Sequence, residues 1–353
     1  MHMAFHELVI SGVRQEGTDA VALEFAVPQE LAAEFAYVPG QYLTLRADID
    51  GQDVRRSYSI ASAPDAPLCV GVRQVEDGVF STYAQGLKVG DTVQVIPPEG
   101  RFMLQNQQDI LLIAAGSGIT PMVSIANAAL AKGARVTLVY GNRDFKHVMF
   151  RSELEALKDQ YMGRFTLIHI LSREEQDVPL LNGRITGEKI GRMAKAGAID
   201  LEAADGVFLC GPGEMITDVS AALSGLGVAK SAIHSERFTP DGEAPRKRSK
   251  AAQAVAGSGV EVEVEVILDG SRKKFRVEEG DENIVAAAAR QGLELPYSCK
   301  GGMCCTCRCR VTEGSAEMAV NYSLEPWELE AGFTLACQTR PTSEKLVLDF
   351  DAA

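Results

Sequence analysis

Five of the eight cysteines lie in one short stretch near the C-terminal end, PYSCKGGMCCTCRC. Cys299, Cys304 and Cys307 have the CxxxxCxxC spacing of a plant-type 2Fe-2S loop, and Cys337 supplies a distant fourth thiolate. The two glycines between the first two ligands give such a loop the freedom to turn its backbone N–H groups toward sulfur. The spacing therefore predicts a centre that accepts and donates one electron at a time.

Zinc sites and disulfides are the other common uses of clustered cysteines. A zinc ribbon needs two CxxC pairs, and here only Cys304 and Cys307 have that spacing. Disulfides form in oxidising compartments, and the chain does not open on a signal peptide, so we expect a cytoplasmic location. We interpret Cys305 and Cys309 as packing thiols outside the ligand set.

The composition is that of an ordinary globular protein. The chain has 353 residues, of which 46% are hydrophobic, and this predicts two or three domains with cores of their own. Its formal net charge of -13 argues against a nucleic-acid partner, because such proteins use Lys and Arg to neutralise phosphates. No apolar run approaches the roughly 18 residues of a membrane-spanning helix, so we expect no membrane partner.

The first part of the chain consists of short alternating segments separated by turns, such as PG at 39–40 and DG at 77–78. This pattern predicts an antiparallel β-barrel over residues 1–105. One predicted strand carries Arg56, Tyr58 and Ser59, which offer a flavin a charge for its phosphate, a ring for stacking and a hydroxyl for a ring nitrogen. A partly solvated strand without a ligand is the alternative interpretation.

From Asp109 an apolar strand, a glycine-rich turn and a helix follow one another, and strands and helices continue to alternate up to residue 238. The alternation predicts a doubly wound α/β domain with a parallel sheet over residues 106–238. Two turns, GSGITP at 116–121 and GPGEMI at 211–216, lie between a strand and a helix. Such turns place a dinucleotide phosphate at a helix N-terminus.

Residues 239–259 are polar, small and charged without periodicity, and we interpret them as a flexible linker. Beyond them, two strands and a helix precede the cysteine loop, which predicts a compact α+β module of the β-grasp type over residues 260–353. This module has seventeen Asp and Glu against ten Lys and Arg. We therefore expect its redox partner to dock with an electropositive face.

Taken in this order, the flavin motif, the nucleotide turns and the cysteine loop resemble the ferredoxin-NADP reductase superfamily fused to a C-terminal plant-type ferredoxin. The resemblance covers essentially the whole chain. More narrowly, SCKGGMCCTC, NYSLEPWELEAGFTLACQ and RPTSEKLVLDF resemble the reductase subunits of phenylacetyl-CoA oxygenases, or epoxidases. Relatives with the same layout serve steroid hydroxylases and acyl desaturases.

The resemblance implies FAD rather than FMN as the flavin, and it implies where the cofactors bind. Flavin contacts fall on Arg56, Ser57, Tyr58, Ser59, Gly78, Val79 and Ser81. Contacts with NAD(P)H fall on Gly116, Gly118, Thr120 and Pro121 for the pyrophosphate, and on Cys210, Gly211, Pro212, Gly213 and Met215 for the nicotinamide. The residues beside the reacting rings are then Tyr58, Ser59, Cys210 and Glu236.

The resemblance also bears on the coenzyme. Ser172 and Arg173 match the place where NADPH-dependent members of the superfamily bind the ribose 2′-phosphate, and Arg143 lies near another predicted strand end. Because an arginine fork suits phosphate, NADPH is the expected coenzyme and NADH is the alternative.

Hydride carries two electrons whereas the cluster accepts one, so a flavin is needed between them. The predicted function is transfer of electrons from NADPH through FAD and a 2Fe-2S cluster to an oxygenase. By resemblance, this oxygenase is the multisubunit di-iron enzyme that forms the epoxide of phenylacetyl-CoA. A reductase for a steroid hydroxylase, an acyl desaturase or a Rieske dioxygenase is the alternative, and a 2Fe-2S redox sensor is the alternative from another class.

Overall fold

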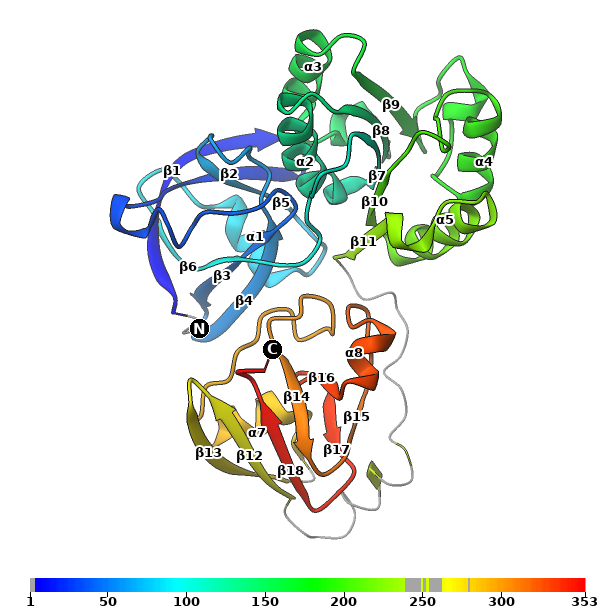
Figure 1. Ribbon diagram of the computed structural model, residues 1–353. Helices are drawn as coiled ribbons and strands as arrows, with labels where there is room; N and C mark the ends of the chain where they lie inside the picture. Colours follow the sequence, from blue (N-terminus) through cyan, green and yellow to red (C-terminus); the bar gives the residue numbers. More distant parts are fainter. Residues whose placement is uncertain (1–3, 239–248, 250–251, 254–261, 279, 353) are drawn as a thin grey trace. The chain divides into compact units, whose positions relative to one another are not determined.

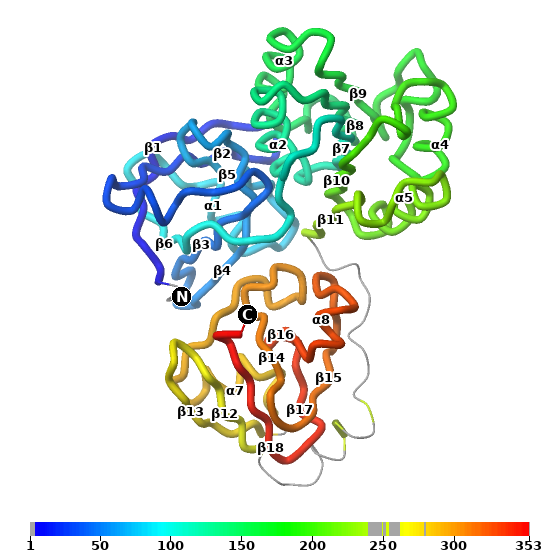
Figure 2. The backbone as a smooth tube through the Cα atoms, viewed as in Figure 1, coloured from blue at the N-terminus to red at the C-terminus, as the bar shows by residue number. Residues whose placement is uncertain are grey.

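The computed structural model describes residues 4–238, 249, 252–253, 262–278 and 280–352 (Figure 1). The chain divides into two compact units, one that holds residues 5–238 and one that holds the C-terminal module, and both can be followed along the backbone in Figure 2. The predicted linker lies outside the described residues except for residues 249, 252 and 253. Within the described residues, no helix combines the length and the apolar character needed to cross a membrane.

The first sheet has six antiparallel strands in the order β4-β3-β6-β1-β2-β5 (Figure 1). An antiparallel bridge between Ile60 and Val70 joins its two edges and closes the sheet, which confirms the predicted barrel. Side chains such as Ile10, Leu43 and Leu45 fill its core without any exposure. The strands are β1 (His6–Glu16), β2 (Ala20–Ala26), β3 (Tyr42–Ile49), β4 (Gln52–Ser59), β5 (Leu68–Arg73) and β6 (Thr92–Glu99).

A short helix, α1 (Val79–Gln85), lies between β5 and β6 and packs against β3, β4 and β5. It was not predicted from the sequence. Its seven residues, VFSTYAQ, include β-branched and aromatic side chains that favour a strand. Burial of Phe80 and Ala84 in the barrel core overrides that preference.

The second sheet has five parallel strands in the order β11-β10-β7-β8-β9, which confirms the predicted doubly wound arrangement. Leu112 and Ala114 of one strand lie in the core with α2 and α3, whereas Leu111 and Ile113 lie in the core with α4 and α5. Helices therefore cover both faces (Figure 1). The elements are β7 (Asp109–Ala115), α2 (Ile119–Ala131), β8 (Arg135–Asn142), α3 (Arg151–Gln160), β9 (Phe165–Leu171), α4 (Gly187–Lys195), β10 (Gly206–Gly211), α5 (Gly213–Gly225) and β11 (Ile233–Arg237).

Within the first unit, polar contacts join the barrel to the α/β domain that contains the parallel sheet. One carboxylate oxygen of Glu16, on β1, accepts a hydrogen bond of 2.6 Å from the backbone N–H of Phe150, and the other accepts one of 2.7 Å from Arg14. Ser124, on α2, donates a hydrogen bond of 2.6 Å to the carbonyl of Ser62. These contacts set the position of the barrel relative to the sheet.

The C-terminal module has a mixed sheet in the order β13-β12-β18-β14-β16, in which β12 and β18 are parallel. The helix after β13 begins at Asn283, whose side chain accepts a hydrogen bond of 3.0 Å from the N–H of Ala286. This arrangement confirms the predicted α+β fold. Its elements are β12 (Val262–Leu268), β13 (Ser271–Val277), α7 (Ile284–Arg290), β14 (Arg308–Glu313), β15 (Ala316–Met318), α8 (Pro326–Glu330), β16 (Phe333–Leu335), β17 (Thr339–Pro341) and β18 (Lys345–Asp349).

The Glu16 contact yields a stability prediction. Replacing Glu16 by Ala leaves the buried N–H of Phe150 without its acceptor, and such a loss costs about 1–3 kcal/mol. We expect the urea midpoint for unfolding of the first unit, followed by the fluorescence of the flavin that it is expected to bind, to fall in Glu16→Ala. Glu155→Ala is the control, because Glu155 is 56% exposed and pairs with Arg151 on the surface of α3. An equal midpoint in the two variants would contradict the role given to Glu16.

Candidate functional site

Strand β4 carries two adjacent arginines with different surroundings. Arg55 is 5% exposed and forms an ion pair with Asp53 at 2.8 Å. Arg56 is exposed, and its Nη1 donates a hydrogen bond of 2.7 Å to the carbonyl of Arg55. Of the two, only Arg56 presents its guanidinium at the surface, where a phosphate can be bound.

The other predicted flavin residues of β4 lie deeper. Ser57 and Tyr58 are half-buried, and Ser59 is 3% exposed. The ring of Tyr58 lies 5.6 Å from the ring of Phe80 on α1. Burial raises the pKa of the Tyr58 phenol, so this ring stays uncharged near neutral pH.

The remaining predicted flavin residues, Gly78, Val79 and Ser81, lie at the start of helix α1. The hydroxyl of Ser81 accepts a hydrogen bond of 3.1 Å from the N–H of Val75 and donates one of 3.2 Å to the carbonyl of Gly78. A Cβ added to Gly78 would lie 2.3 Å from the Ser81 oxygen, so a larger residue there would displace the Ser81 side chain. Val79 is 46% exposed beside it. The Ser81 side chain therefore holds the turn together, whereas Val79 is the residue that faces outward.

The two glycine-rich turns meet at the carboxyl ends of neighbouring strands, β7 and β10. A Cβ added to Gly118 would lie 2.2 Å from the carbonyl oxygen of Cys210, and one added to Gly211 would lie 3.3 Å from the backbone nitrogen of Ala115. Gly116 has a φ of 58°, in the left-handed region that favours glycine. The turns are packed backbone against backbone, and such turns suit a dinucleotide pyrophosphate.

The side chains of three other predicted nucleotide residues are buried, namely Thr120, Pro121 and Met215. The hydroxyl of Thr120 donates a hydrogen bond of 2.8 Å to the carbonyl of Ser117. Pro212 is exposed, and Gly213 begins α5 directly after it. Ser117 is partly exposed, so it is the side chain that the first turn offers to a ligand, although only its neighbours were predicted to have a role.

Three strands bring together Ser59, Cys210 and Glu236. Strands β10 and β11 pair Cys210 with Glu236, and the Ser59 hydroxyl donates a hydrogen bond of 3.1 Å to Oε2 of Glu236. Burial raises the pKa of Glu236 to about 8, and it also raises the pKa of the Cys210 thiol. A carboxyl group with such a pKa is protonated at neutral pH and can hold a proton beside a ligand.

The residues predicted to choose the coenzyme lie at the carboxyl ends of β8 and β9. The N–H of Ser172 donates to the carbonyl of Asn142 at 2.9 Å, and the N–H of Arg173 donates to the carbonyl of Arg143 at 2.7 Å. Arg143 and Arg173 therefore lie side by side, and both are exposed.

Asn142 is a candidate that was not predicted from the sequence. It is 8% exposed, and its side-chain amide lies near the Tyr140 hydroxyl but, within the described residues, makes no hydrogen bond of good geometry. Buried amides are almost always paired, so an unpaired one at the carboxyl edge of the sheet is available to a ligand. The signal in the sequence is a polar residue at the end of an apolar strand.

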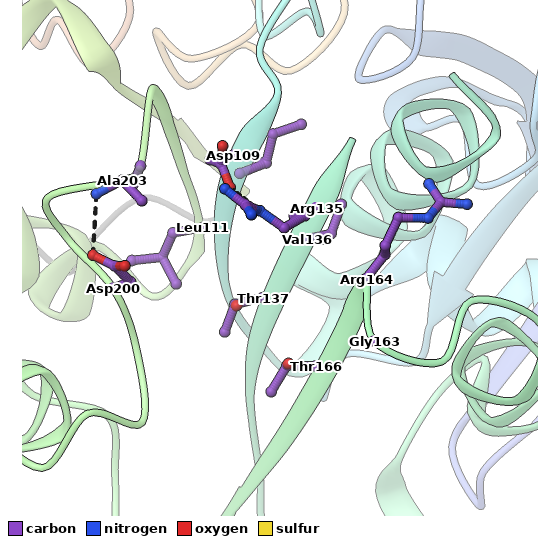
Figure 3. A pocket seen from close by; sticks show the side chains of 12 residues that line it. Asp109, Leu111, Arg135, Val136, Thr137, Gly163, Arg164, Thr166, Asp200 and Ala203 are labelled. Atoms are coloured by element: carbon purple, nitrogen blue, oxygen red, sulfur yellow. Dashed lines mark hydrogen bonds and ion pairs between the residues drawn. The ribbon is translucent and has the colours of Figure 1, made fainter. Parts of the chain in front are cut away.

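A cavity of 310 Å³ lies at the amino ends of the strands of the same sheet, opposite the ends that carry the glycine-rich turns (Figure 3). Its lining includes the first residues of two strands, Asp109 of β7 and Arg135 of β8, which form an ion pair at 2.5 Å. Thr137 of β8 and Thr166 of β9 also line the cavity and lie opposite each other on these neighbouring strands. Ligands of parallel sheets bind at the carboxyl ends of strands, so we do not assign this cavity to the nucleotide.

The four predicted ligand thiols form two pairs in the C-terminal module. Cys299 lies against Cys304, and Cys307 lies against Cys337. The Cys304 thiol and nearby backbone N–H groups lower the pKa of Cys299 by hydrogen bonding. Among the described residues, no three His, Cys, Asp or Glu side chains are grouped as the ligands of one metal ion. Because a 2Fe-2S cluster holds two thiolates on each iron, two pairs of thiols fit it.

The loop that carries these thiols needs left-handed backbone at several residues. Lys300, Gly302 and Cys305 have φ values of 51°, 74° and 62°. The loop turns the N–H of Gly301 toward the sulfur of Cys299, at 3.3 Å. Backbone donors of this kind stabilise the negative charge of a thiolate.

The structure shows all eight cysteines as thiols and none in a disulfide. Cys69, Cys210 and Cys309 are buried in hydrophobic cores. Cys305 is only partly buried, and its thiol donates a hydrogen bond of 3.0 Å to the hydroxyl of Ser323. Cys309 thus has the surroundings of a packing thiol, whereas Cys305 is held by a polar contact.

Three protein families match successive parts of the chain. They are the oxidoreductase FAD-binding domain over residues 7–104, the oxidoreductase NAD-binding domain over residues 112–221 and the 2Fe-2S iron-sulfur cluster binding domain over residues 266–342. The predictions of FAD, a nicotinamide nucleotide and a 2Fe-2S cluster are confirmed at the level of these domains.

Relatives of similar length share the whole layout. The chain is 43% identical over 356 residues to a subunit of the 1,2-phenylacetyl-CoA epoxidase of Escherichia coli strain K12, a match that covers 99% of this chain and 98% of that protein. It is 38% identical over 353 residues to the ferredoxin reductase component of 3-ketosteroid-9-alpha-monooxygenase of Rhodococcus rhodochrous, with coverage of 97% and 96%. Among solved structures, phthalate dioxygenase reductase has the same fold, with a TM-score of 0.59, 22% identity and 98% coverage of each chain. The chain therefore belongs to the family of oxygenase reductase components that join an FAD-binding, an NAD-binding and a 2Fe-2S ferredoxin domain.

Proposed function

We propose that this protein takes electrons from NADPH and delivers them, through FAD and a 2Fe-2S cluster, to an oxygenase component. The observation that carries the proposal is the arrangement of four thiols in two pairs in a chain that also has flavin and nucleotide domains. When bound, FAD accepts hydride and releases electrons singly, which joins a two-electron donor to a one-electron acceptor. The side chains supply binding, orientation and a place for the proton.

The roles of the flavin residues follow from their surroundings. The exposed guanidinium of Arg56 would bind the flavin phosphate, and the half-buried ring of Tyr58 would lie against the flavin ring. The hydroxyl of Ser59 would face the ring edge, and Glu236 would hold a proton next to it. The turn at Gly78 would support the pyrophosphate.

The coenzyme would bind along the carboxyl edge of the parallel sheet. Its pyrophosphate would lie on the backbone of the turn at 116–118, and its nicotinamide would lie beside the segment 210–215. Arg143 and Arg173, side by side and exposed, would bind a 2′-phosphate, which favours NADPH over NADH. The unpaired amide of Asn142 would bind to the same nucleotide.

The proposed acceptor is the oxygenase that acts on phenylacetyl-CoA, a multisubunit di-iron enzyme. This proposal rests on the relative that is 43% identical over its whole length and is named as part of 1,2-phenylacetyl-CoA epoxidase. A steroid-hydroxylating oxygenase is the second candidate, because a relative of 38% identity serves a ketosteroid monooxygenase.

The function is tested by removing the cluster while keeping the flavin. Cys304→Ser is expected to lose its iron and the visible absorbance of the cluster, to keep NADPH-dependent reduction of ferricyanide, and to lose support of phenylacetyl-CoA epoxidation by the purified oxygenase component. Cys305→Ser is the matched control, because this thiol bonds to Ser323 and belongs to neither pair. Full epoxidation by iron-free Cys304→Ser would show that the flavin donates directly, and loss of iron from Cys305→Ser would show that the ligand set is wrong.

The coenzyme assignment is tested at Arg173. Arg173→Ala should raise the KM for NADPH by about tenfold or more and leave the KM for NADH unchanged, because only NADPH has the 2′-phosphate for a charge-assisted contact. Arg135→Ala is the control, since Arg135 is 65% exposed at the opposite edge of the sheet. Equal changes for both coenzymes would remove Arg173 from the coenzyme site.

Glu236 gives a pH prediction. Its pKa is raised from 4.5 to about 8, so the folded protein keeps a proton that the unfolded chain releases, and stability falls as the pH rises through this range. The rate of flavin reduction by NADPH, measured by stopped flow, should fall above a pH of about 8, where the carboxyl loses the proton that it can donate. In Glu236→Gln this fall should disappear while flavin stays bound. An unchanged pH profile in Glu236→Gln would assign the ionisation to another group.

A further inference from the structure

Helix α8 exposes two large hydrophobic side chains. Trp327 is 56% exposed and Leu329 is 43% exposed, and among the described residues of the C-terminal module no other large hydrophobic side chain is exposed. Because Trp327 and Leu329 are two positions apart, they lie on different sides of the helix, and Trp327 shares its side with Glu330, three positions further on. Tryptophan is also enriched at the centres of protein interfaces.

We define the α8 face as Trp327 together with Glu325, which directly precedes the helix, and Glu330 at its end, and all three are exposed. The indole N–H of Trp327 donates a hydrogen bond of 3.2 Å to the carboxylate of Glu325, so the ring is oriented. An apolar centre with acidic groups beside it suits a partner that has an apolar recess surrounded by Lys or Arg.

The buried side of α8 is joined to the cysteine loop. Glu328 is fully buried and pairs with Arg308 at 2.7 Å. Arg308 directly follows Cys307, and its guanidinium lies 3.6 Å from the centre of the Phe333 ring. Phe333 begins β16, the strand that leads to Cys337. Helix α8 is thereby attached to the segments that carry both thiols of the second pair.

The segment that precedes α8 is attached to the other part of the loop. The hydroxyl of Ser323 accepts a hydrogen bond of 3.0 Å from Cys305 and donates one of 3.2 Å to the carbonyl of Gly302. The N–H of Tyr322 donates to the same carbonyl at 3.1 Å. Helix α8 and the segment before it therefore hold the cysteine loop at two places. A protein bound to the α8 face would contact this supporting helix.

The distribution of charge identifies the kind of occupant. The C-terminal module has seventeen acidic against ten basic residues, and residues 1–238 have 29 Asp and Glu against 21 Lys and Arg. The FAD- and NAD-binding unit is thus acidic as well, and a second copy of the chain has a net charge of -13. Neither has the excess of positive charge that would complement the α8 face. A separate protein with a surface patch of Lys and Arg would supply that positive charge.

The geometry points to the α8 face as the docking surface for the oxygenase component, with Trp327 in an apolar recess and the two carboxylates paired with Lys or Arg around it. This inference rests on the proposed function, which supplies the oxygenase as partner. Docking there would place the oxygenase on the helix that Glu328 and Arg308 join to the segment of Cys307.

Trp327 is the only tryptophan in the chain, so 5-fluorotryptophan places a single fluorine label on this face of the full-length holoprotein. Its NMR signal should shift on titration with the unlabelled, purified oxygenase component of phenylacetyl-CoA epoxidase, and high salt should reduce the affinity. By calorimetry, Trp327→Ala and Glu330→Lys should each weaken binding by at least about tenfold, with flavin content, iron content and ferricyanide reduction unchanged. Leu329→Ala is the matched control, because Leu329 is 43% exposed on a different side of the same helix, and it should bind like the wild type.

Other results would overturn the inference. Wild-type affinity in both Trp327→Ala and Glu330→Lys would place the docking surface elsewhere. A fluorine shift that depends on protein concentration without the oxygenase would assign the α8 face to self-association. Weak quenching of Trp327 by acrylamide in the free chain would assign the face to the chain's own first unit. Absence of any binding by the wild type would overturn the proposed acceptor, and the docking surface for it as well.

Discussion

Hydride passes only between rings in contact, so a protein that reduces a flavin with a nicotinamide must hold two separate folds edge to edge. In this chain the junction is marked by the hydrogen bond from Ser59 to Glu236, which joins β4 of the barrel to β11 of the parallel sheet across 177 positions in the sequence. The contact between Glu16 and Phe150 holds the same two folds together from outside the site. At this junction Ser59 is buried and Glu236 is partly buried, and this burial raises the pKa of Glu236 to about 8.

A different constraint governs the cysteine loop. Ligands that are close in sequence can turn their sulfurs inward only if the intervening backbone takes left-handed conformations, and such conformations persist only where neighbours hold them. The side chain of Gln338 donates a hydrogen bond of 2.7 Å to the carbonyl of Lys300, and Ser323 bonds to Cys305. Residues that follow the loop in the chain therefore hold the loop in its conformation.

The Arg308–Glu328 pair shows how that support is built. A buried ion pair gains little stability, because both charges lose their hydration. Glu328 makes a second contact as well, because its other carboxylate oxygen accepts a hydrogen bond of 3.0 Å from the N–H of Glu325 at the start of α8. One carboxylate thus starts the helix and anchors it to the residue after Cys307. The arrangement specifies where α8 lies, and as a result Trp327 and Leu329 are left facing solvent.

The sequence by itself determined the three folds, because the periods of two and about three and a half residues and the glycine turns are local properties of the chain. It did not reveal α1, whose side chains favour a strand until Phe80 is buried. It named Arg56 and Glu236 as candidates, yet only the tertiary structure decided that Arg55 is buried with Asp53 while Arg56 is exposed. The unpaired amide of Asn142, the two thiol pairs and the exposure of Trp327 were also decided by the tertiary structure. Burial and proximity depend on which distant segments remove water from a residue, and no local pattern in a sequence records that.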